Sequence, residues 1–137
     1  MLDPLLNKIL RPPLAIAAKP LTRLGITADQ VTIFGFVLGI LAVPAIIAEQ
    51  FNLALVLILL NRVCDGLDGA VARQTYSSDA GGFLDISLDF IFYSAIVFAF
   101  IVSHPEQNAV AGSLLMLSFT ATGSCFLAFA IMASKHN

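Results

Sequence analysis

Four long apolar segments dominate the sequence and restrict the folds open to it. They run approximately from Ala28 to Ala48, Phe51 to Arg73, Gly82 to Ser103 and Ala109 to Ala133. Each is close to the roughly 20 residues that an α-helix needs to cross the hydrocarbon of a bilayer. Because 58% of the residues are hydrophobic and only 12% are charged, a soluble globular domain is disfavoured. We therefore expect an all-α polytopic membrane bundle with four transmembrane helices.

The N-terminal segment, residues 1–26, has a different character. Its apolar residues recur at helical spacing and its polar residues fall between them. The apolar positions are Leu2, Leu5, Leu6 and Ile9. This pattern predicts an amphipathic interfacial helix that Pro12 and Pro13 interrupt, followed by a transmembrane domain over residues 27–137. Prolines and charges near the start do not fit a cleaved signal peptide, so we expect the segment to be retained.

The start and the orientation of the first crossing can be read from the residues around it. Thr27 and Gln30 have the spacing of a capping box, which predicts a helix beginning after Thr27. With four crossings, six basic residues fall on one side: Lys8, Arg11, Lys19, Arg23, Arg73 and Lys135. The connections near Glu49 and at residues 104–106 contain no lysine or arginine. The positive-inside rule therefore predicts that the basic side, with both termini, is cytoplasmic.

Charge and cysteine content exclude or weaken other classes. The formal net charge of −2 offers no basic field for nucleic acid, so nucleic acid is not an expected partner. Cys64 and Cys125 both lie in apolar runs and imply no disulfide framework.

Four aspartates are concentrated where the second apolar segment ends and the third begins. Asp65 and Asp68 are three residues apart, and Asp85 and Asp89 are four apart, so each pair shares one helix face. Consecutive antiparallel helices bring the end of one beside the start of the next. We therefore expect the two pairs to face each other on one side of the membrane.

This quartet predicts a site for divalent cations. Four ionised carboxylates in a partly lipid-shielded cavity repel one another and lose hydration, so protons or cations must neutralise some of them. Two Mg²⁺ ions would balance four carboxylates, and Mn²⁺ is a second candidate. Two such ions can clamp phosphate oxygens during an in-line displacement. Asp89 lies deepest from the cytoplasmic end and is the candidate general base.

The residues around the aspartates admit two interpretations. Gly66, Gly69, Gly81 and Gly82 allow close approach either of a substrate or of another helix. Arg73 could pair with a phosphate, although a basic residue at a cytoplasmic helix end needs no substrate to explain it. We expect Arg62 to pair with one of the carboxylates or to extend toward the headgroups.

Residues 65–89, DGLDGAVARQTYSSDAGGFLDISLD, closely resemble the signature of the CDP-alcohol phosphotransferase (CDP-alcohol phosphatidyltransferase) family. That signature is D-x-x-D-G-x-x-A-R, a variable gap, and G-x-x-x-D-x-x-x-D. Every specified position is filled: Asp65, Asp68, Gly69, Ala72, Arg73, Gly81, Asp85 and Asp89. The upstream ITADQVT is similar to the family's segment that opens the first crossing.

The resemblance implies transfer of a phosphatidyl-type group from a CDP-linked lipid to a small alcohol, with release of CMP, in phospholipid biosynthesis. It implies a two-metal site of Asp65, Asp68, Asp85 and Asp89 at the cytoplasmic face, with Asp89 also accepting the proton. It further implies a substrate site that includes Gly69, Ala72, Arg73, Ser78 and Thr32.

Members of this family commonly have six crossings. Only four are expected here, so the resemblance also implies a fragment or a shortened form of a six-helix fold, or an assembly such as a homodimer in which association replaces the missing wall. Three other functions remain open alternatives: a membrane prenyltransferase that uses a prenyl diphosphate, a non-catalytic binding subunit, and a cation transporter.

Overall fold

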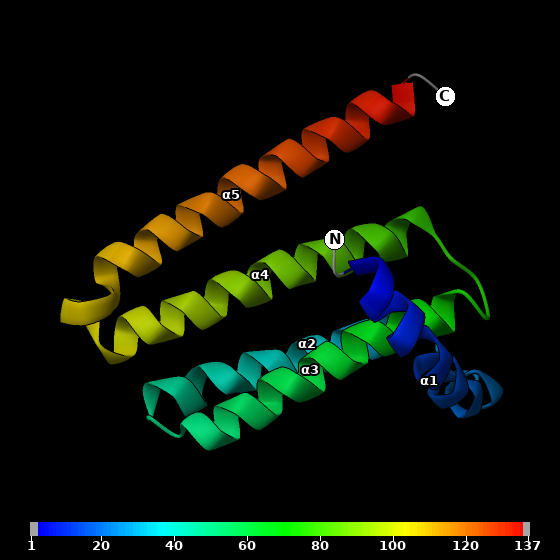
Figure 1. The fold of residues 1–137 in the computed structure, drawn as a ribbon, viewed down its shortest axis with the longest axis horizontal. Coiled ribbons are helices and arrows are strands. Elements are labelled where there is room, and N and C mark those ends of the chain that lie inside the picture. The colour runs from blue at the N-terminus through cyan, green and yellow to red at the C-terminus, as the bar shows by residue number, and fades with distance from the viewer. Residues whose placement is uncertain (1–2, 136–137) are drawn as a thin grey trace.

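The computed structural model describes the backbone of residues 3–135 and the side chains of residues 10–133. This part of the chain forms helices and no strands (Figure 1). The helices are α1 (Asp3–Arg23), α2 (Ala28–Ile47), α3 (Phe51–Ala72), α4 (Asp79–Ser103) and α5 (Pro105–Lys135). The expected all-α polytopic bundle is therefore confirmed.

The helices are arranged so that their connections gather at two opposite ends. α2 and α3 form an antiparallel pair, α4 packs against α2, and α5 turns back to pack against α4. The α1–α2 and α3–α4 connections lie at one end of the bundle, and the α2–α3 and α4–α5 connections at the other (Figure 1). The end of α3 and the start of α4, which carry the aspartates, are consequently close together.

Three helices are long and apolar enough to cross a membrane. They are Ala28–Ile47, Asp79–Ser103 and residues 105–133 of α5. α3 is 22 residues long, but it contains Arg62, Asp65 and Asp68, so hydropathy alone does not mark it as a span. All four predicted crossings coincide with helices, and the passage of α3 through the membrane stays a prediction.

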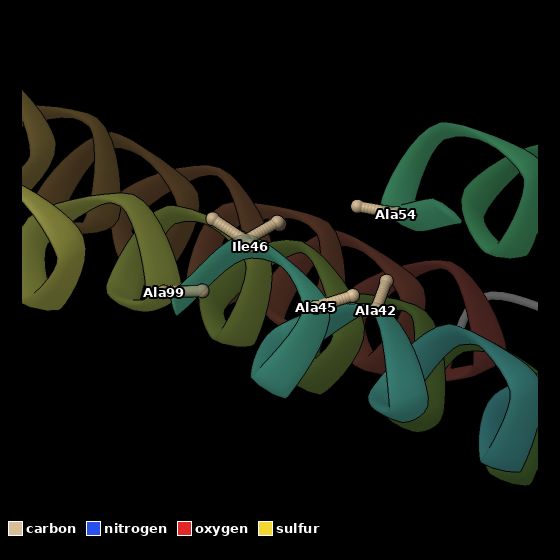
Figure 2. Packing of buried hydrophobic residues seen from close by; sticks show 5 residues of the cluster. All are labelled: Ala42, Ala45, Ile46, Ala54 and Ala99. Atoms are coloured by element: carbon tan, nitrogen blue, oxygen red, sulfur yellow. The ribbon is translucent and has the colours of Figure 1, made fainter. Parts of the chain in front are cut away.

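Small side chains make the close contacts between the central helices. Ala42, Ala45 and Ile46 of α2 are buried with Ala54 of α3 and Ala99 of α4 (Figure 2). Lipid tails are as apolar as leucine, so helix association in a bilayer depends on close van der Waals packing rather than on exclusion of water. Alanines at these positions allow the backbones to approach, while large apolar side chains remain on the outer surface.

The beginning of α2 follows the predicted capping box. The backbone N–H of Gln30 donates to Thr27 Oγ1 at 3.3 Å, and the backbone N–H of Thr27 donates to Gln30 Oε1 at 3.1 Å. Two backbone donors that the first helical turn would leave unpaired are thereby satisfied.

The predicted interruption of the N-terminal helix is wrong. α1 continues through Pro12 and Pro13, although each proline removes a helical hydrogen bond. Contacts with α3 offset this cost: Ala18 is completely buried against Ala70 and Val71. The side chains predicted to form the apolar face of this segment, those of Leu2, Leu5, Leu6 and Ile9, lie outside the described residues.

Candidate active site

The four aspartates line one small cavity between α2, α3 and α4. Asp65 and Asp68 come from the last turns of α3, and Asp85 and Asp89 from the first turns of α4. Thr32, Phe36 and Leu88 complete the lining. The spacing of three and four residues therefore does bring the two pairs to a common space.

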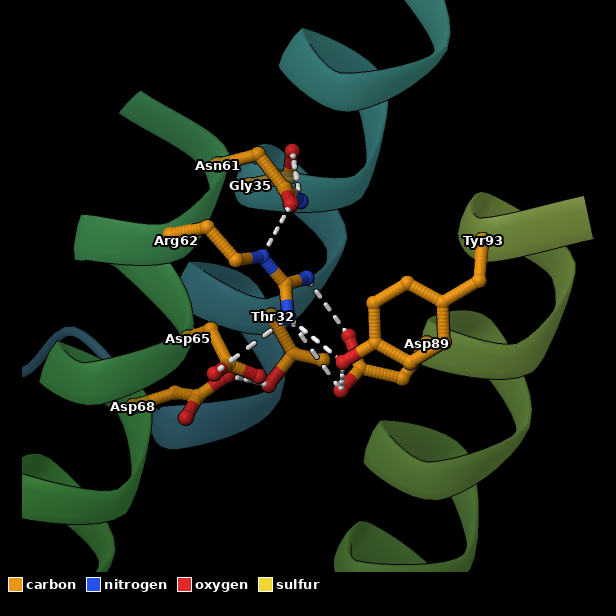
Figure 3. Close-up of polar contacts among 8 residues, drawn as sticks. All are labelled: Thr32, Gly35, Asn61, Arg62, Asp65, Asp68, Asp89 and Tyr93. Atoms are coloured by element: carbon orange, nitrogen blue, oxygen red, sulfur yellow. Dashed lines mark hydrogen bonds and ion pairs between the residues drawn. The ribbon is translucent and has the colours of Figure 1, made fainter. Parts of the chain in front are cut away.

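Asp68 is the most buried of these carboxylates and is held by α2. Asp68 is only 5% exposed, and its Oδ2 lies 2.7 Å from the Thr32 hydroxyl (Figure 3). Thr32 Oγ1 also lies 3.0 Å from the Ala28 carbonyl oxygen. A hydroxyl donates one proton, and the shorter distance favours donation to Asp68.

Asp89 is held by different partners from Asp68. Arg62 Nη2 lies 2.7 Å from Asp89 Oδ1, and the Tyr93 hydroxyl donates to Asp89 Oδ2 at 2.8 Å (Figure 3). Arg62 Nη1 also lies 3.7 Å from Asp65 Oδ2, so the guanidinium reaches both aspartate pairs. The expectation that Arg62 pairs with a motif carboxylate is confirmed.

A larger cavity of about 220 Å³ adjoins the aspartates. Its lining includes all five predicted substrate-binding residues: Thr32, Gly69, Ala72, Arg73 and Ser78. Three residues, Thr32, Asp68 and Asp85, line both cavities. The aspartate quartet and the candidate substrate residues therefore border one continuous polar region.

The glycines divide between the two interpretations that the sequence left open. A Cβ on Gly69 would lie 3.2 Å from Arg73 Nη1, so this glycine makes room for the guanidinium in the larger cavity. A Cβ on Gly66 would instead meet Leu14 of α1 at 3.0 Å, which indicates a role in helix packing. Nothing lies within 4 Å of a Cβ on Gly82.

Gly81 and Ser78 shape the opposite wall of the larger cavity. Ser78 precedes α4, and its Oγ accepts a hydrogen bond from the Gly81 amide at 3.0 Å. A Cβ on Gly81 would lie 2.8 Å from Asp29 Oδ1. Gly81 therefore permits the start of α4 to approach the start of α2, and Asp29 becomes a further carboxylate in the lining.

The donor atoms fit a hard divalent cation, although the side chains are not preassembled around one. Carboxylate oxygens are the ligands that Mg²⁺ and Mn²⁺ prefer. Among the side chains of residues 10–133, no group of three or more Asp, Glu, His or Cys is arranged to hold a metal ion as it stands. The ion pair with Arg62 accounts for part of this, because it engages Asp89.

Two further residues of the site, Asn61 and Tyr93, were not indicated by the sequence motifs. Asn61 is 4% exposed, and its Oδ1 accepts a hydrogen bond from Arg62 Nε at 2.8 Å. Tyr93 is four residues after Asp89 and bonds to it. Residues four apart lie on the same helix face, so the sequence spacing alone could have indicated that Tyr93 neighbours Asp89.

Comparisons with known proteins agree with the motif. Residues 25–136 match the model of the CDP-alcohol phosphatidyltransferase family. The inner membrane protein YnjF of Escherichia coli strain K12 is 52% identical over 136 residues, which cover 99% of this chain and 66% of that protein. The archaetidylinositol phosphate synthase of Pyrococcus horikoshii is 38% identical over 98 residues, covering 69% of this chain and 52% of the synthase. No solved structure matches the chain.

The chain thus spans just under two thirds of the length of the bacterial relative and about half of the archaeal one. The family match nevertheless includes the whole of α2, α3 and α4 and every residue that lines the two cavities. This polytopic helical membrane protein belongs to the CDP-alcohol phosphatidyltransferase family.

Proposed function

We propose that the protein transfers a phosphatidyl-type group from a CDP-linked lipid to an acceptor alcohol and releases CMP. One observation carries the proposal beyond the family match. The cavity of the four aspartates and the cavity of Arg73 share Thr32, Asp68 and Asp85. A diphosphate bound near Arg73 would therefore lie beside the carboxylates.

The larger cavity is suited to the diphosphate of the donor. Arg73 can bind phosphate oxygens through two parallel N–H donors, because its guanidinium is planar. Gly69 and Ala72, beside Arg73, have small or no side chains and leave space in the cavity, and Ser78 contributes a hydroxyl at the opposite wall. The apolar outer surfaces of the helices are available to the lipid chains of the donor.

The aspartates serve the transfer itself in this proposal. Asp65, Asp68, Asp85 and Asp89 would hold two Mg²⁺ or Mn²⁺ ions, which supply positive charge to the phosphate oxygens when bound. The acceptor oxygen forms a bond to phosphorus as the bond between phosphorus and the CMP oxygen breaks. Asp89 takes the hydroxyl proton of the acceptor, and CMP leaves as an anion.

We also propose that this site opens to the cytoplasm. Lys19 and Arg23 lie toward the end of α1, and Arg73 lies at the end of α3. The connections at the opposite end of the bundle, residues 48–50 and 104, contain no lysine or arginine. The positive-inside rule assigns the basic end, which also holds both cavities, to the cytoplasmic side.

An Asp68→Asn substitution tests the proposed function. Purified protein in liposomes is supplied with Mg²⁺, CDP-diacylglycerol and a panel of small alcohols, and CMP release is measured. Removing one ionised carboxylate from the cation site should reduce CMP release by about 100-fold or more. Asp79→Asn is the matched control, because Asp79, at the start of α4, is an aspartate of the same region that lines neither cavity.

Undiminished CMP release by Asp68→Asn would contradict the proposal. Turnover of prenyl diphosphates without turnover of any CDP-linked lipid would also contradict it and would favour a membrane prenyltransferase. Binding of CDP-diacylglycerol by the wild-type protein, with no acceptor giving CMP, would favour the non-catalytic alternative.

A further inference from the structure

Arg62 stands between the two aspartate pairs and is held from several directions. Its Nη2 lies 2.7 Å from Asp89 Oδ1, its Nη1 lies 2.7 Å from the Tyr93 hydroxyl, and Nη1 lies 3.7 Å from Asp65 Oδ2 (Figure 3). Every terminal nitrogen of the guanidinium therefore points toward the aspartate side of the cavity. A side chain that merely extended to the headgroups would not make these contacts.

The guanidinium is also fixed from behind. Arg62 Nε donates to Asn61 Oδ1 at 2.8 Å, and Asn61 Nδ2 donates to the Gly35 carbonyl of α2 at 2.9 Å. The Arg62 Cζ lies 4.8 Å from the ring centre of Phe92 and 5.1 Å from that of Tyr93. Residues of three helices thus position one positive charge, which indicates a built arrangement rather than a loose surface pair.

Arg62 forms an ion pair with Asp89, one of the carboxylates proposed to bind a cation. Both oxygens of Asp89 are engaged, Oδ1 by Arg62 and Oδ2 by Tyr93. Where side chains are described, over residues 10–133, three acidic, histidine or cysteine side chains nowhere form a group that could hold a metal ion. A cation that used Asp89 together with its neighbours would compete with the guanidinium for this carboxylate.

We infer that Arg62 is a positioning residue, an internal counter-cation of Asp89 with which a divalent ion competes for this carboxylate. The inference rests on the proposed function only in requiring that a divalent cation binds at the aspartates. Arg62 holds Asp89 at the cavity through the ion pair, and Asp89 would leave the guanidinium to serve as a ligand of a divalent cation. Affinity for the cation is therefore lower than the four carboxylates alone would give.

Equilibrium binding of Mn²⁺ alone tests this competition. Free Mn²⁺ is measured by electron paramagnetic resonance in the purified wild-type protein and in Arg62→Gln, with Mg²⁺ as the competing ion. Losing a charge-assisted ion pair from Asp89 should tighten the Mn²⁺ dissociation constant by about tenfold. Arg73→Gln is the matched control, because it removes the same charge from the adjoining cavity without opening the Asp89 pair.

Tyr93 provides a second readout that leaves Arg62 in place. The chain contains two tyrosines and no tryptophan, so Tyr76→Phe makes Tyr93 the single reporter of ultraviolet absorption and fluorescence. Mg²⁺ that withdraws Asp89 from Arg62 also removes the carboxylate from the Tyr93 hydroxyl. The Tyr93 spectrum should then change and saturate at the Mg²⁺ concentrations at which the cation binds.

The outcomes separate this inference from the proposed function. If wild type binds Mn²⁺ and releases CMP, but Arg62→Gln binds Mn²⁺ no more tightly than Arg73→Gln does, the inference is overturned and the function stands. If neither wild type nor Arg62→Gln binds Mn²⁺, both fail. If Arg62→Gln does not fold, two measurements remain: Mn²⁺ binding by Arg62→Lys, and the Tyr93 spectrum of the protein that keeps Arg62. An unchanged Tyr93 spectrum at saturating Mg²⁺ overturns the competition.

Discussion

Gly69 lies one helical turn before Arg73 on α3, and its missing side chain gives the arginine its place in the larger cavity. A Cβ there would stand 3.2 Å from Arg73 Nη1, which is the far end of a flexible side chain. The arginine could yield by turning its guanidinium, and the helix backbone would not need to move. The expected effect of a small residue at this position is therefore on substrate binding and not on folding.

Gly69→Ala should accordingly separate stability from activity. Alanine in a helix is favoured over glycine by roughly 0.5–1 kcal/mol, so thermal stability should be unchanged or slightly higher. The KM for CDP-diacylglycerol should rise, because Arg73 is displaced from the diphosphate. Gly82→Ala is the matched control, since Gly82 lines the same cavity but a Cβ there meets nothing within 4 Å, and it should raise KM less. Loss of stability in Gly69→Ala, with KM unchanged, would show that Gly69 serves helix packing.

At the residue scale, the sequence predicted clusters better than individual hydrogen bonds. The helical spacing of the aspartates was enough to place them around one cavity, since consecutive antiparallel helices must bring these ends together. The burial of Asn61 was not predictable, because it depends on the Gly35 carbonyl of another helix. The distance between Arg62 and Asp89 likewise depends on how α3 and α4 pack, and sequence spacing alone does not determine it.

At the scale of elements, α1 and α3 form a small interface next to the larger cavity. Ala18 has no exposed surface and packs against Ala70 and Val71, and Gln74 Nε2 donates to the Ala15 carbonyl at 2.8 Å. The local pattern predicted a break at Pro12 and Pro13, because each proline removes a hydrogen bond of its own helix. The compensating contacts come from residues more than fifty positions later and were not visible in that pattern.

An Ala18→Leu substitution tests whether this interface holds α1 in place. Extra methylene groups in a packed contact typically cost roughly 1–3 kcal/mol, so the variant should unfold at a lower temperature in detergent than wild type does. Ala17→Leu is the matched control, because Ala17 is exposed on the same helix, and its effect should stay within about 0.5 kcal/mol. Equal unfolding temperatures for the two variants would contradict the packing of α1 on α3.

At the scale of the whole molecule, the membrane path of α3 decides how the site is reached. α2, α4 and α5 qualify as spans, whereas α3 carries charges in its second half. Those charges face α2 and α4: Asp68 meets Thr32, and Arg62 meets Asp89. Charged residues inside a membrane are tolerated when they pair within the bundle. Hydropathy sums a whole segment and therefore underrates a helix whose polar residues are paired internally.

Labelling of single cysteines tests whether α3 crosses the membrane. With Cys64 and Cys125 replaced by alanine, cysteine is placed at Gln50, Ser77 or Glu106, which lie at or beside the α2–α3, α3–α4 and α4–α5 connections. A membrane-impermeant maleimide applied to right-side-out vesicles should label Gln50→Cys and Glu106→Cys, and should label Ser77→Cys only after the vesicles are opened. If Gln50→Cys and Ser77→Cys react from the same side, α3 does not span the bilayer. The aspartates would then lie at a surface and not inside a bundle, and their pairing with Arg62 and Thr32 would have to persist in water.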